Sequence, residues 1–372
     1  MSDPKPDSLL IGIEFAGTGA HPASWRRTDS RAEELFTAPY WVDLVTAADR
    51  SGVDLAFFPD SFAVQSEGRH ATRGRLEAVA TAARVSALTT RIGLIPTATV
   101  THTEPFHVSK SIASIDFSSV GRAGWQVAVS ETAEQAALFG RKQPQSEESL
   151  WAEAAEAVEV ASRLWDSWED DAEIRDVATG RFIDRDKLHY IDFEGEHFSV
   201  KGPSITPRSP QGQPLVAVDA SLPQARDLAV RRADLIRISA VDVDDATSVA
   251  RLVHEQAAAL GRNVRVLLDV DVLIGADRGA ADDALAELDE WATVPYVARS
   301  LFYRGDSAAL VDLLREIDGA AGLDGVVLRP LALAAGVDKI TSEVLPVVNP
   351  RPDTAPTLRE RLGFELPANQ FA

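Results

Sequence analysis

The sequence contains no cysteine and a single methionine among its 372 residues. The absence of cysteine excludes disulfides, thiolate catalysis and cysteine-ligated metals. No stretch approaches the roughly 18 consecutive apolar residues of a membrane-spanning helix, and no apolar segment precedes residue 9. We therefore expect a soluble, cytoplasmic protein that makes no membrane contact.

Positive charge is also scarce, because 37 Lys and Arg face 57 Asp and Glu, for a net charge of −20. The basic residues form no cluster, so nucleic acid is not an expected partner. A phosphate-bearing ligand would need a local device, such as a helix N-terminus, to offset the acidic field. The seven histidines are scattered without metal-ligand spacing, so we expect no metal site.

What the sequence does contain is eight short apolar runs, each finishing on or beside a polar residue and separated from the next by helix-forming sequence. Runs without in-out alternation are typical of parallel strands that are buried on both faces. Eight of them predict an α/β protein, a (β/α)8 TIM barrel, in which function resides where the strands end. The runs are Leu9–Phe15, Val53–Asp60, Arg91–Thr97, Gly124–Ser130, Pro214–Ser221, Asp234–Ser239, 264–275 and Asp324–Pro330.

The alternation of apolar runs with helix-forming sequence indicates one barrel domain over residues 1–372, and it is interrupted once. Residues 166–212 read as an insertion between the fourth helix and the fifth strand, and alternation around Glu194 and Gly195 predicts a β-hairpin within it. We expect this insertion to pack over the top of the barrel. Residues 346–372 are rich in proline and predict an extended tail that wraps the outside.

Three strand ends carry candidate ligand-binding groups. Asp60 could accept hydrogen bonds from a ligand, or equally cap the next segment. Thr97 offers a hydroxyl at the same level, although a β-branched strand residue is its plainer interpretation. Ser221 precedes a helix start and could bind phosphate, or simply serve as an N-cap. Asp219 would oppose a phosphate there unless its side chain points into the barrel.

Other candidates lie on helices and loops. Trp151 could form a flat wall for an aromatic ligand, although core packing is the default for such a residue. Glu147, one turn earlier, could equally serve the helix dipole. His102 and His107 are weak candidates for acid–base roles. Arg329 could meet an anionic substrate or pair with an acid. No nucleophile–base–orienter set is visible, which favours a cofactor as the carrier of the reaction.

Several segments resemble one family, the bacterial luciferase-like flavin-dependent monooxygenases, in the branch with nitrilotriacetate, dibenzothiophene-sulfone and pristinamycin-synthesis monooxygenases. The resembling segments cover nearly the whole chain in order, and GRAGW and LWDSWE…PRSPQG are the specific ones. They are FFPD (57–60), IGLIPTATVTHTEPFHVSKSIASIDFSSVGRAGW (92–125), ALFG (137–140), RLWDSWEDDA (163–172), KLHYIDFEGEHFSVKGP (187–203), PRSPQGQPL (207–215) and TLRERLG (357–363).

The resemblance implies a barrel that takes reduced FMN from a separate NAD(P)H:flavin reductase and uses O2 to oxygenate a small organic substrate through a flavin C4a-(hydro)peroxide. It also implies a homodimer. The family's flavin positions carry over to Asp60, Thr97, Glu147 and Trp151, and to Ser221 for the phosphate.

Three of these positions depart from the family's pattern. Glu147 stands where the family usually has His, Trp151 where it has Tyr, and Leu222 where the phosphate turn has a second Ser. Loss of one hydroxyl contact costs on the order of 1 kcal/mol. Two alternatives therefore stay open: an oxidoreductase that uses the deazaflavin F420, and a degenerate, non-catalytic barrel that acts as a partner subunit or small-molecule binder.

Overall fold

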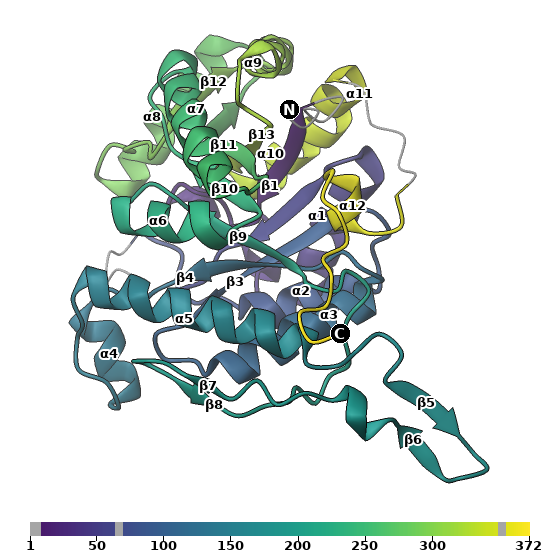
Figure 1. Cartoon of the computed structure of the whole chain (residues 1–372). Helices are drawn as coiled ribbons and strands as arrows, with labels where there is room; N and C mark the ends of the chain where they lie inside the picture. The colour runs from purple at the N-terminus through teal and green to yellow at the C-terminus, as the bar shows by residue number, and fades with distance from the viewer. Residues whose placement is uncertain (1–8, 64–69, 349–354) are drawn as a thin grey trace.

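The computed structural model describes residues 9–63, 70–348 and 355–372, and its centre is a closed barrel of eight parallel strands (Figure 1). The ring closes because β1 pairs with both β2 and β13, and β10 pairs with β11. Each predicted run overlaps one of these strands, so the predicted (β/α)8 architecture is confirmed. The strands are β1 (Leu10–Glu14), β2 (Leu55–Phe58), β3 (Gly93–Thr99), β4 (Gly124–Ala128), β9 (Leu215–Asp219), β10 (Leu235–Ile238), β11 (Arg265–Ile274) and β13 (Gly325–Pro330).

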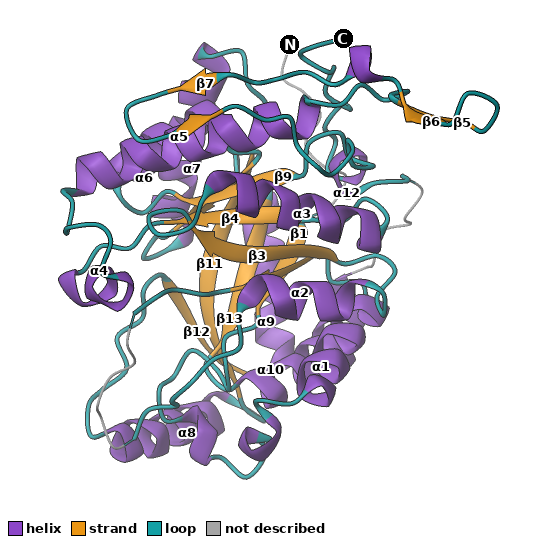
Figure 2. Cartoon of the chain, turned by 90° about the horizontal axis from the view of Figure 1, so that it is seen from below, coloured by secondary structure: helices purple, strands orange, loops and turns teal. Residues whose placement is uncertain are grey.

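Helices surround the ring and bury the outer faces of its strands (Figure 2). Ser146 caps the long helix α5, because its hydroxyl accepts the Ser149 N–H at 3.3 Å. The helices are α1 (Ala38–Ser51), α2 (Ala78–Ser86), α3 (Pro105–Ser119), α4 (Ala133–Phe139), α5 (Glu147–Asp166), α6 (Pro223–Arg232), α7 (Val243–Ala259), α8 (Arg278–Ala292), α9 (Ser307–Gly319), α10 (Leu333–Lys339), α11 (Leu345–Val348) and α12 (Leu358–Arg361).

A ninth parallel strand, β12 (Leu301–Gly305), lies outside the ring and pairs with the last half of β11. The sequence analysis missed it because four of its five side chains are only half-buried, so it lacks the fully apolar run of a barrel strand. The loop between α8 and β12 crosses the carboxyl end of the barrel.

The insertion holds two hairpins, β5 (Glu173–Asp176) with β6 (Arg181–Ile183), and β7 (Phe193–Glu194) with β8 (Ser199–Val200). The hairpin predicted around Gly195 is confirmed as β7–β8, but its expected position over the top of the barrel is wrong. The Glu156 carboxylate on α5 accepts backbone N–H groups from this turn at 2.8–3.2 Å and holds it on the outer side of that helix. The β5–β6 hairpin projects away from the body (Figures 1 and 2).

The expectation of an extended, wrapping tail is wrong for its middle part, and residues 349–354 lie outside the described residues. Leu358 and Leu362 belong to α12 and its C-cap, and they pack with Phe364 into the amino end of the barrel interior. The tail folds this way because the inner faces of the strands would otherwise leave apolar side chains open to water at that end. Within the described ranges, no helix is long and apolar enough to cross a membrane.

Candidate functional site

A cavity of about 520 Å³ opens at the carboxyl end of the barrel, and we call it the mouth cavity. This volume lies within the range of small-molecule and cofactor sites. Barrel enzymes place their chemistry at this end because the loops that follow the strands converge there. The lining residues come from strand ends, from loops and from α5: Glu14, Pro59, Asp60, Thr97, Gln126, Val127, Ala128, Val129, Glu131, Trp151, Asp219, Ser221, Leu222, Arg237, Ser239, Asp269, Arg299 and Arg329.

Most of the predicted site residues meet in this one cavity. Five flavin candidates line it together, and Arg329 lines it as well; the five are Asp60, Thr97, Trp151, Ser221 and Leu222. They are separated by up to 162 positions in the sequence, and only the closure of the barrel brings them together. No residue of the 166–212 insertion lines the cavity.

Asp60 combines the ligand-facing position with the capping role that the sequence left open. Its carboxylate accepts the backbone N–H of Ser61 at 2.8 Å and that of Ala78, the first residue of α2, at 3.0 Å. Two of its acceptor sites are therefore used in holding the loop after β2 against α2. The remaining lone pairs are what a ligand could use.

Trp151 forms part of the cavity wall and is only 9% exposed, and its indole Nε1 has no hydrogen-bond partner among the described residues. Glu147, the other flavin candidate on α5, is not brought into this cavity. Glu147 is solvent-exposed in the first turn of α5 and does not line the cavity. It lies one helical turn, about 5–6 Å, nearer the N-terminus of α5. That step carries its side chain past the wall that Trp151 forms.

Neither candidate histidine reaches the mouth cavity. His102 stacks on Phe139 with ring centroids 4.5 Å apart, and burial lowers the pKa of His102, with the charge of Lys142 acting in the same direction. His107 lines an adjoining groove of about 600 Å³ that the side chains of α2 and α3 border and that shares Asp60 and Thr97 with the mouth cavity. The structure therefore places neither histidine in the mouth cavity itself, and His107 lies in the groove beside it.

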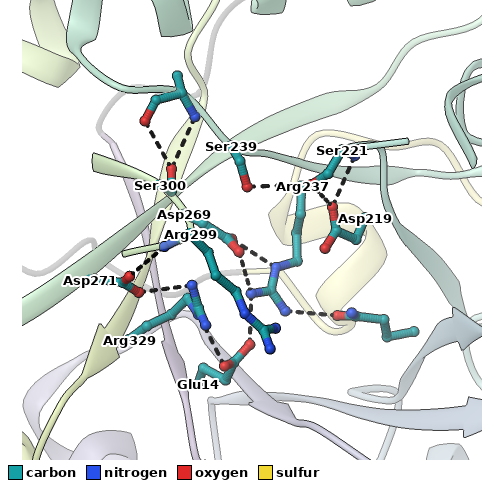
Figure 3. Close-up of polar contacts among 12 residues, drawn as sticks. Glu14, Asp219, Ser221, Arg237, Ser239, Asp269, Asp271, Arg299, Ser300 and Arg329 are labelled. Atoms are coloured by element: carbon teal, nitrogen blue, oxygen red, sulfur yellow. Dashed lines mark hydrogen bonds and ion pairs between the residues drawn. The ribbon is translucent and has the colours of Figure 1, made fainter. Parts of the chain in front are cut away.

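An ion-pair network occupies the floor of the mouth cavity (Figure 3). Glu14 accepts from Arg237 at 2.7 Å and from Arg329 at 3.1 Å. Asp269 accepts a bidentate pair of hydrogen bonds from Arg237 at 2.8 and 2.7 Å. Asp271 lies 2.8 Å from a guanidinium nitrogen of Arg329. These five groups, from β1, β10, β11 and β13, connect strands that are neighbours or face one another inside the ring.

The network separates the pKa values of its carboxyl groups. Burial opposes ionisation of Glu14, but attraction to Arg237 and Arg329 outweighs it and lowers the pKa of Glu14 to about 2. Burial raises the pKa of Asp269 to about 6, because it has one arginine partner instead of two. Burial also raises the pKa of Asp271, despite the charge of Arg329.

The predicted phosphate position, Ser221, is already hydrogen-bonded to an acid. The Asp219 carboxylate accepts the Ser221 backbone N–H at 3.0 Å and its hydroxyl as well. The Ser221 hydroxyl also lies 3.3 Å from that of Ser239. The following helix, α6, begins with Pro223, which has no backbone N–H to offer. Leu222, where a second hydroxyl was expected, provides no side-chain cap.

The loop between α8 and β12 places a further cation, Arg299, at the mouth. The Arg299 backbone N–H and the Tyr296 hydroxyl both donate to Asp271, at 3.1 and 3.0 Å. Ser300 bonds the backbone of Ala240 at 3.0 and 3.2 Å. The Arg299 guanidinium has no bonded partner in the described part of the chain and reaches toward the network on the floor (Figure 3).

The sequence analysis missed several lining residues. Arg237 and Asp269 line the cavity and Asp271 belongs to the ion-pair network, and all three did leave a signal, because each is a charge inside an otherwise apolar strand. Asp269 and Asp271 are two residues apart, which places them on the same face of β11. Arg299 left no signal, since a single arginine in a polar loop is ordinary. No cluster that could hold a metal ion is present among the residues the structure describes.

Barrel architecture and a ligand-sized cavity at the carboxyl strand ends define the class of an α/β-barrel enzyme that acts on a small molecule. The chain belongs to the luciferase-like monooxygenases, whose family match spans residues 18–317. As a member of this family, it is an oxidoreductase of the monooxygenase type. The predicted resemblance is confirmed, since relatives named for nitrilotriacetate, dibenzothiophene-sulfone and pristinamycin IIA synthesis all match.

Two relatives and one solved structure illustrate the similarity. N-acetyl-S-(2-succino)cysteine monooxygenase of Bacillus subtilis (strain 168) is 29% identical, with 99% of each chain covered. Nitrilotriacetate monooxygenase component A of Aminobacter aminovorans is 31% identical over 84% of this chain and 72% of its own. A riboflavin lyase, solved with modified FMN and the substrate riboflavin, aligns with a TM-score of 0.86 at 24% identity over 97% of both chains and shows the shared fold.

The two ends of FMN would meet different environments in the mouth cavity. Trp151, Val127, Val129 and Leu222 offer apolar surface for a flat ring, with the Thr97 side chain beside them. A phosphate at Ser221 would instead meet the carboxylate of Asp219. The residues present therefore fit a flavin ring and do not fit the phosphate at its predicted position.

Proposed function

We propose that this chain is a flavin-dependent monooxygenase that binds reduced flavin in the mouth cavity and uses O2 to oxygenate a small organic substrate. A reduced flavin supplies the O2 chemistry that the side chains lack, and the protein supplies binding and orientation. The observation that carries the proposal is the meeting of Asp60, Thr97 and Trp151 with residues of the β9–α6 turn in one cavity of cofactor size.

Arg299 points to the class of substrate. Three arginines line the cavity, and carboxylates bind two of them, Arg237 and Arg329. The Arg299 guanidinium is the third, and it has no bonded partner in the described ranges. An unpaired guanidinium on a tethered loop is suited to a carboxylate, which it can bind through two parallel hydrogen bonds. Nitrilotriacetate and N-acetyl-S-(2-succino)cysteine, named for two relatives, both carry carboxylates. We therefore propose a substrate that bears at least one carboxylate.

The proposal includes a partner and an assembly. The nitrilotriacetate relative is named as component A, which fits a system in which a second component reduces the flavin. We propose a separate NAD(P)H:flavin reductase for this chain as well. Homodimer formation stays a prediction of the sequence resemblance.

Anaerobic titration of the full-length chain with reduced riboflavin and reduced FMN tests the proposal. Trp151 lies in the cavity wall, so we expect saturable quenching of tryptophan fluorescence that Trp151→Phe largely removes. Trp291→Phe is the matched control, because Trp291 lies outside the mouth cavity, against Arg26. Binding of neither flavin would refute the proposal and favour the non-catalytic alternative.

Turnover provides the second measurement. With a flavin reductase, NADH and O2, we expect oxygenated product from a carboxylate-bearing probe such as nitrilotriacetate or a succinylated thioether. Arg299→Gln should raise KM for that probe by about tenfold or more, while flavin affinity stays within about twofold, because one charge-assisted contact is lost. An unchanged KM would refute the role of Arg299 in substrate binding.

A further inference from the structure

The turn between β9 and α6 carries a carboxylate where a flavin phosphate is expected. Asp219 ends β9, and its carboxylate accepts both the backbone N–H and the hydroxyl of Ser221. Asp219, Ser221 and Ser239 all line the mouth cavity (Figure 3). The Asp219 side chain therefore bonds the Ser221 hydroxyl while it lines the cavity, so its negative charge lies beside the position where a phosphate at Ser221 would bind.

The backbone around this turn offers little in compensation. The Ala220 N–H donates to the Arg237 carbonyl at 2.9 Å, the Ser221 N–H is bonded to Asp219, and Pro223 has no N–H. Phosphate sites at helix N-termini depend on such free N–H groups together with an absence of nearby negative charge. The first turn of α6 has no side-chain cap, so its N–H groups beyond Pro223 meet the first requirement only in part, and the Asp219 carboxylate violates the second.

Charge in the rest of the cavity does not reverse this balance. Arg226, Arg231 and Arg232 are nearer to Ser221 along the chain but do not line the mouth cavity, and Arg237, which does line it, is held by Glu14 and Asp269. Arg299 reaches toward that network on the floor instead of toward Ser221 (Figure 3). A phosphate dianion at Ser221 would thus face the Asp219 carboxylate without a cation dedicated to it.

We infer that the mouth cavity selects a flavin whose ribityl chain ends in a hydroxyl, as in riboflavin, over one that ends in a phosphate, and that Asp219 sets this preference. The inference rests on the proposed function, since it requires a flavin in this cavity. Asp219 is a specificity-determining residue here because it contacts the end of the chain and not the reacting ring.

The same groups that oppose a phosphate suit a polyol. A carboxylate accepts hydrogen bonds from hydroxyl groups, and the hydroxyls of Ser221 and Ser239 can each donate or accept. A terminal ribityl O–H can therefore donate to Asp219, in a charge-assisted bond that is stronger than a bond between neutral groups. A phosphate dianion has no proton to donate and would add repulsion between like charges.

A set of paired titrations tests the inference. Anaerobic tryptophan-fluorescence titration of the wild-type chain with reduced riboflavin and with reduced FMN should give a dissociation constant for FMN that is about tenfold higher or more, in low salt. Asp219→Asn keeps the side-chain shape and one acceptor oxygen but removes the charge. We expect it to strengthen FMN binding by about tenfold and to weaken riboflavin binding by about threefold or more. High salt should narrow the wild-type difference between the two ligands.

Asp227→Asn is the matched control. Asp227 lies on the same helix, α6, pairs with Arg231 on the surface and does not line the mouth cavity. Its loss changes the net charge of the chain by the same amount as the test variant. We expect affinity for both ligands to stay within about twofold.

Three results would overturn the inference. FMN could bind the wild-type chain as tightly as riboflavin does, or Asp219→Asn could leave the ratio of the two dissociation constants unchanged. Selective weakening of FMN by Arg299→Gln would show that the phosphate binds at Arg299. If neither ligand bound the wild type or any variant, the proposed function would fail and this inference with it, whereas tight FMN binding refutes the inference alone.

Discussion

Replacing Glu14 tests whether the ion network on the cavity floor stabilises the fold. Glu14→Gln keeps the side-chain shape but leaves Arg237 and Arg329 with one carboxylate each. The lowering of the pKa of Glu14 from 4.5 to about 2 corresponds to about 3 kcal/mol of stability. This agrees with the 3–5 kcal/mol typical of breaking a buried ion pair.

The perturbation should be visible in thermal unfolding at pH 7. With an unfolding entropy of about 2.1 cal/mol/K per residue, 3–5 kcal/mol in a chain of 372 residues is a fall in Tm of about 4–6 °C. Asp312→Asn is the control, because Asp312 forms an exposed pair with Arg315 at 3.3 Å. Such surface pairs contribute at most about 1 kcal/mol, so its Tm should fall by about 1 °C or less.

The pH dependence gives a sharper test. A carboxyl group whose pKa is lowered in the folded state stabilises the fold above its unfolded pKa, and this contribution is lost as pH falls through the folded value. The difference in unfolding free energy between wild type and Glu14→Gln should therefore narrow as the pH falls from 4.5 to about 2. The contribution of Asp269 to stability depends on pH in the opposite direction, because its pKa is raised to about 6 and the charge of Glu14 adds to that rise. The unfolding free energies of wild type and variant must therefore be compared at each pH. A variant within 1 °C of wild type at pH 7 would show that this reasoning is wrong.

Three further changes address the scaffold. Arg122→Met should lower the urea midpoint by an amount equal to about 3 kcal/mol or more, because the buried carbonyls of Ser86, Thr89 and Ile92 lose a donor. A midpoint equal to that of wild type would contradict this. Asp49→Asn should destabilise the fold at pH 7 but not near pH 2. Burial raises the pKa of Asp49, but the hydrogen bonds that its carboxylate accepts from backbone N–H groups outweigh burial and lower the pKa overall. The stability that the ionised carboxylate contributes is therefore lost in acid. Leu358→Ala should cost about 2–5 kcal/mol in thermal unfolding and leave flavin affinity unchanged, whereas Leu366→Ala, at an exposed leucine, should cost little.

The eight barrel strands were predictable from the sequence because a strand that is buried on both faces must be apolar at nearly every position. Val53–Asp60, for example, overlaps β2 and ends on a residue that lines the mouth cavity. The convergence of Asp60, Thr97 and Ser221 also followed from the sequence, since parallel strands in a barrel share one carboxyl end. Residue type and strand period were sufficient for this part.

Tertiary structure alone decided how the polar groups pair and where the extra segments lie. Glu147 has the helical spacing of a partner for Trp151, yet the wall ends between them. Glu156 holds the β7–β8 hairpin on α5, and Leu362 packs the tail against the amino end of the barrel interior. Asp219 lines the mouth cavity and bonds Ser221 at the same time, an arrangement that only the path of the chain decides. Composition and period specify which side chains are buried, but the partner of a buried charge depends on distances between strands that are remote in sequence, which exist only after the ring has closed.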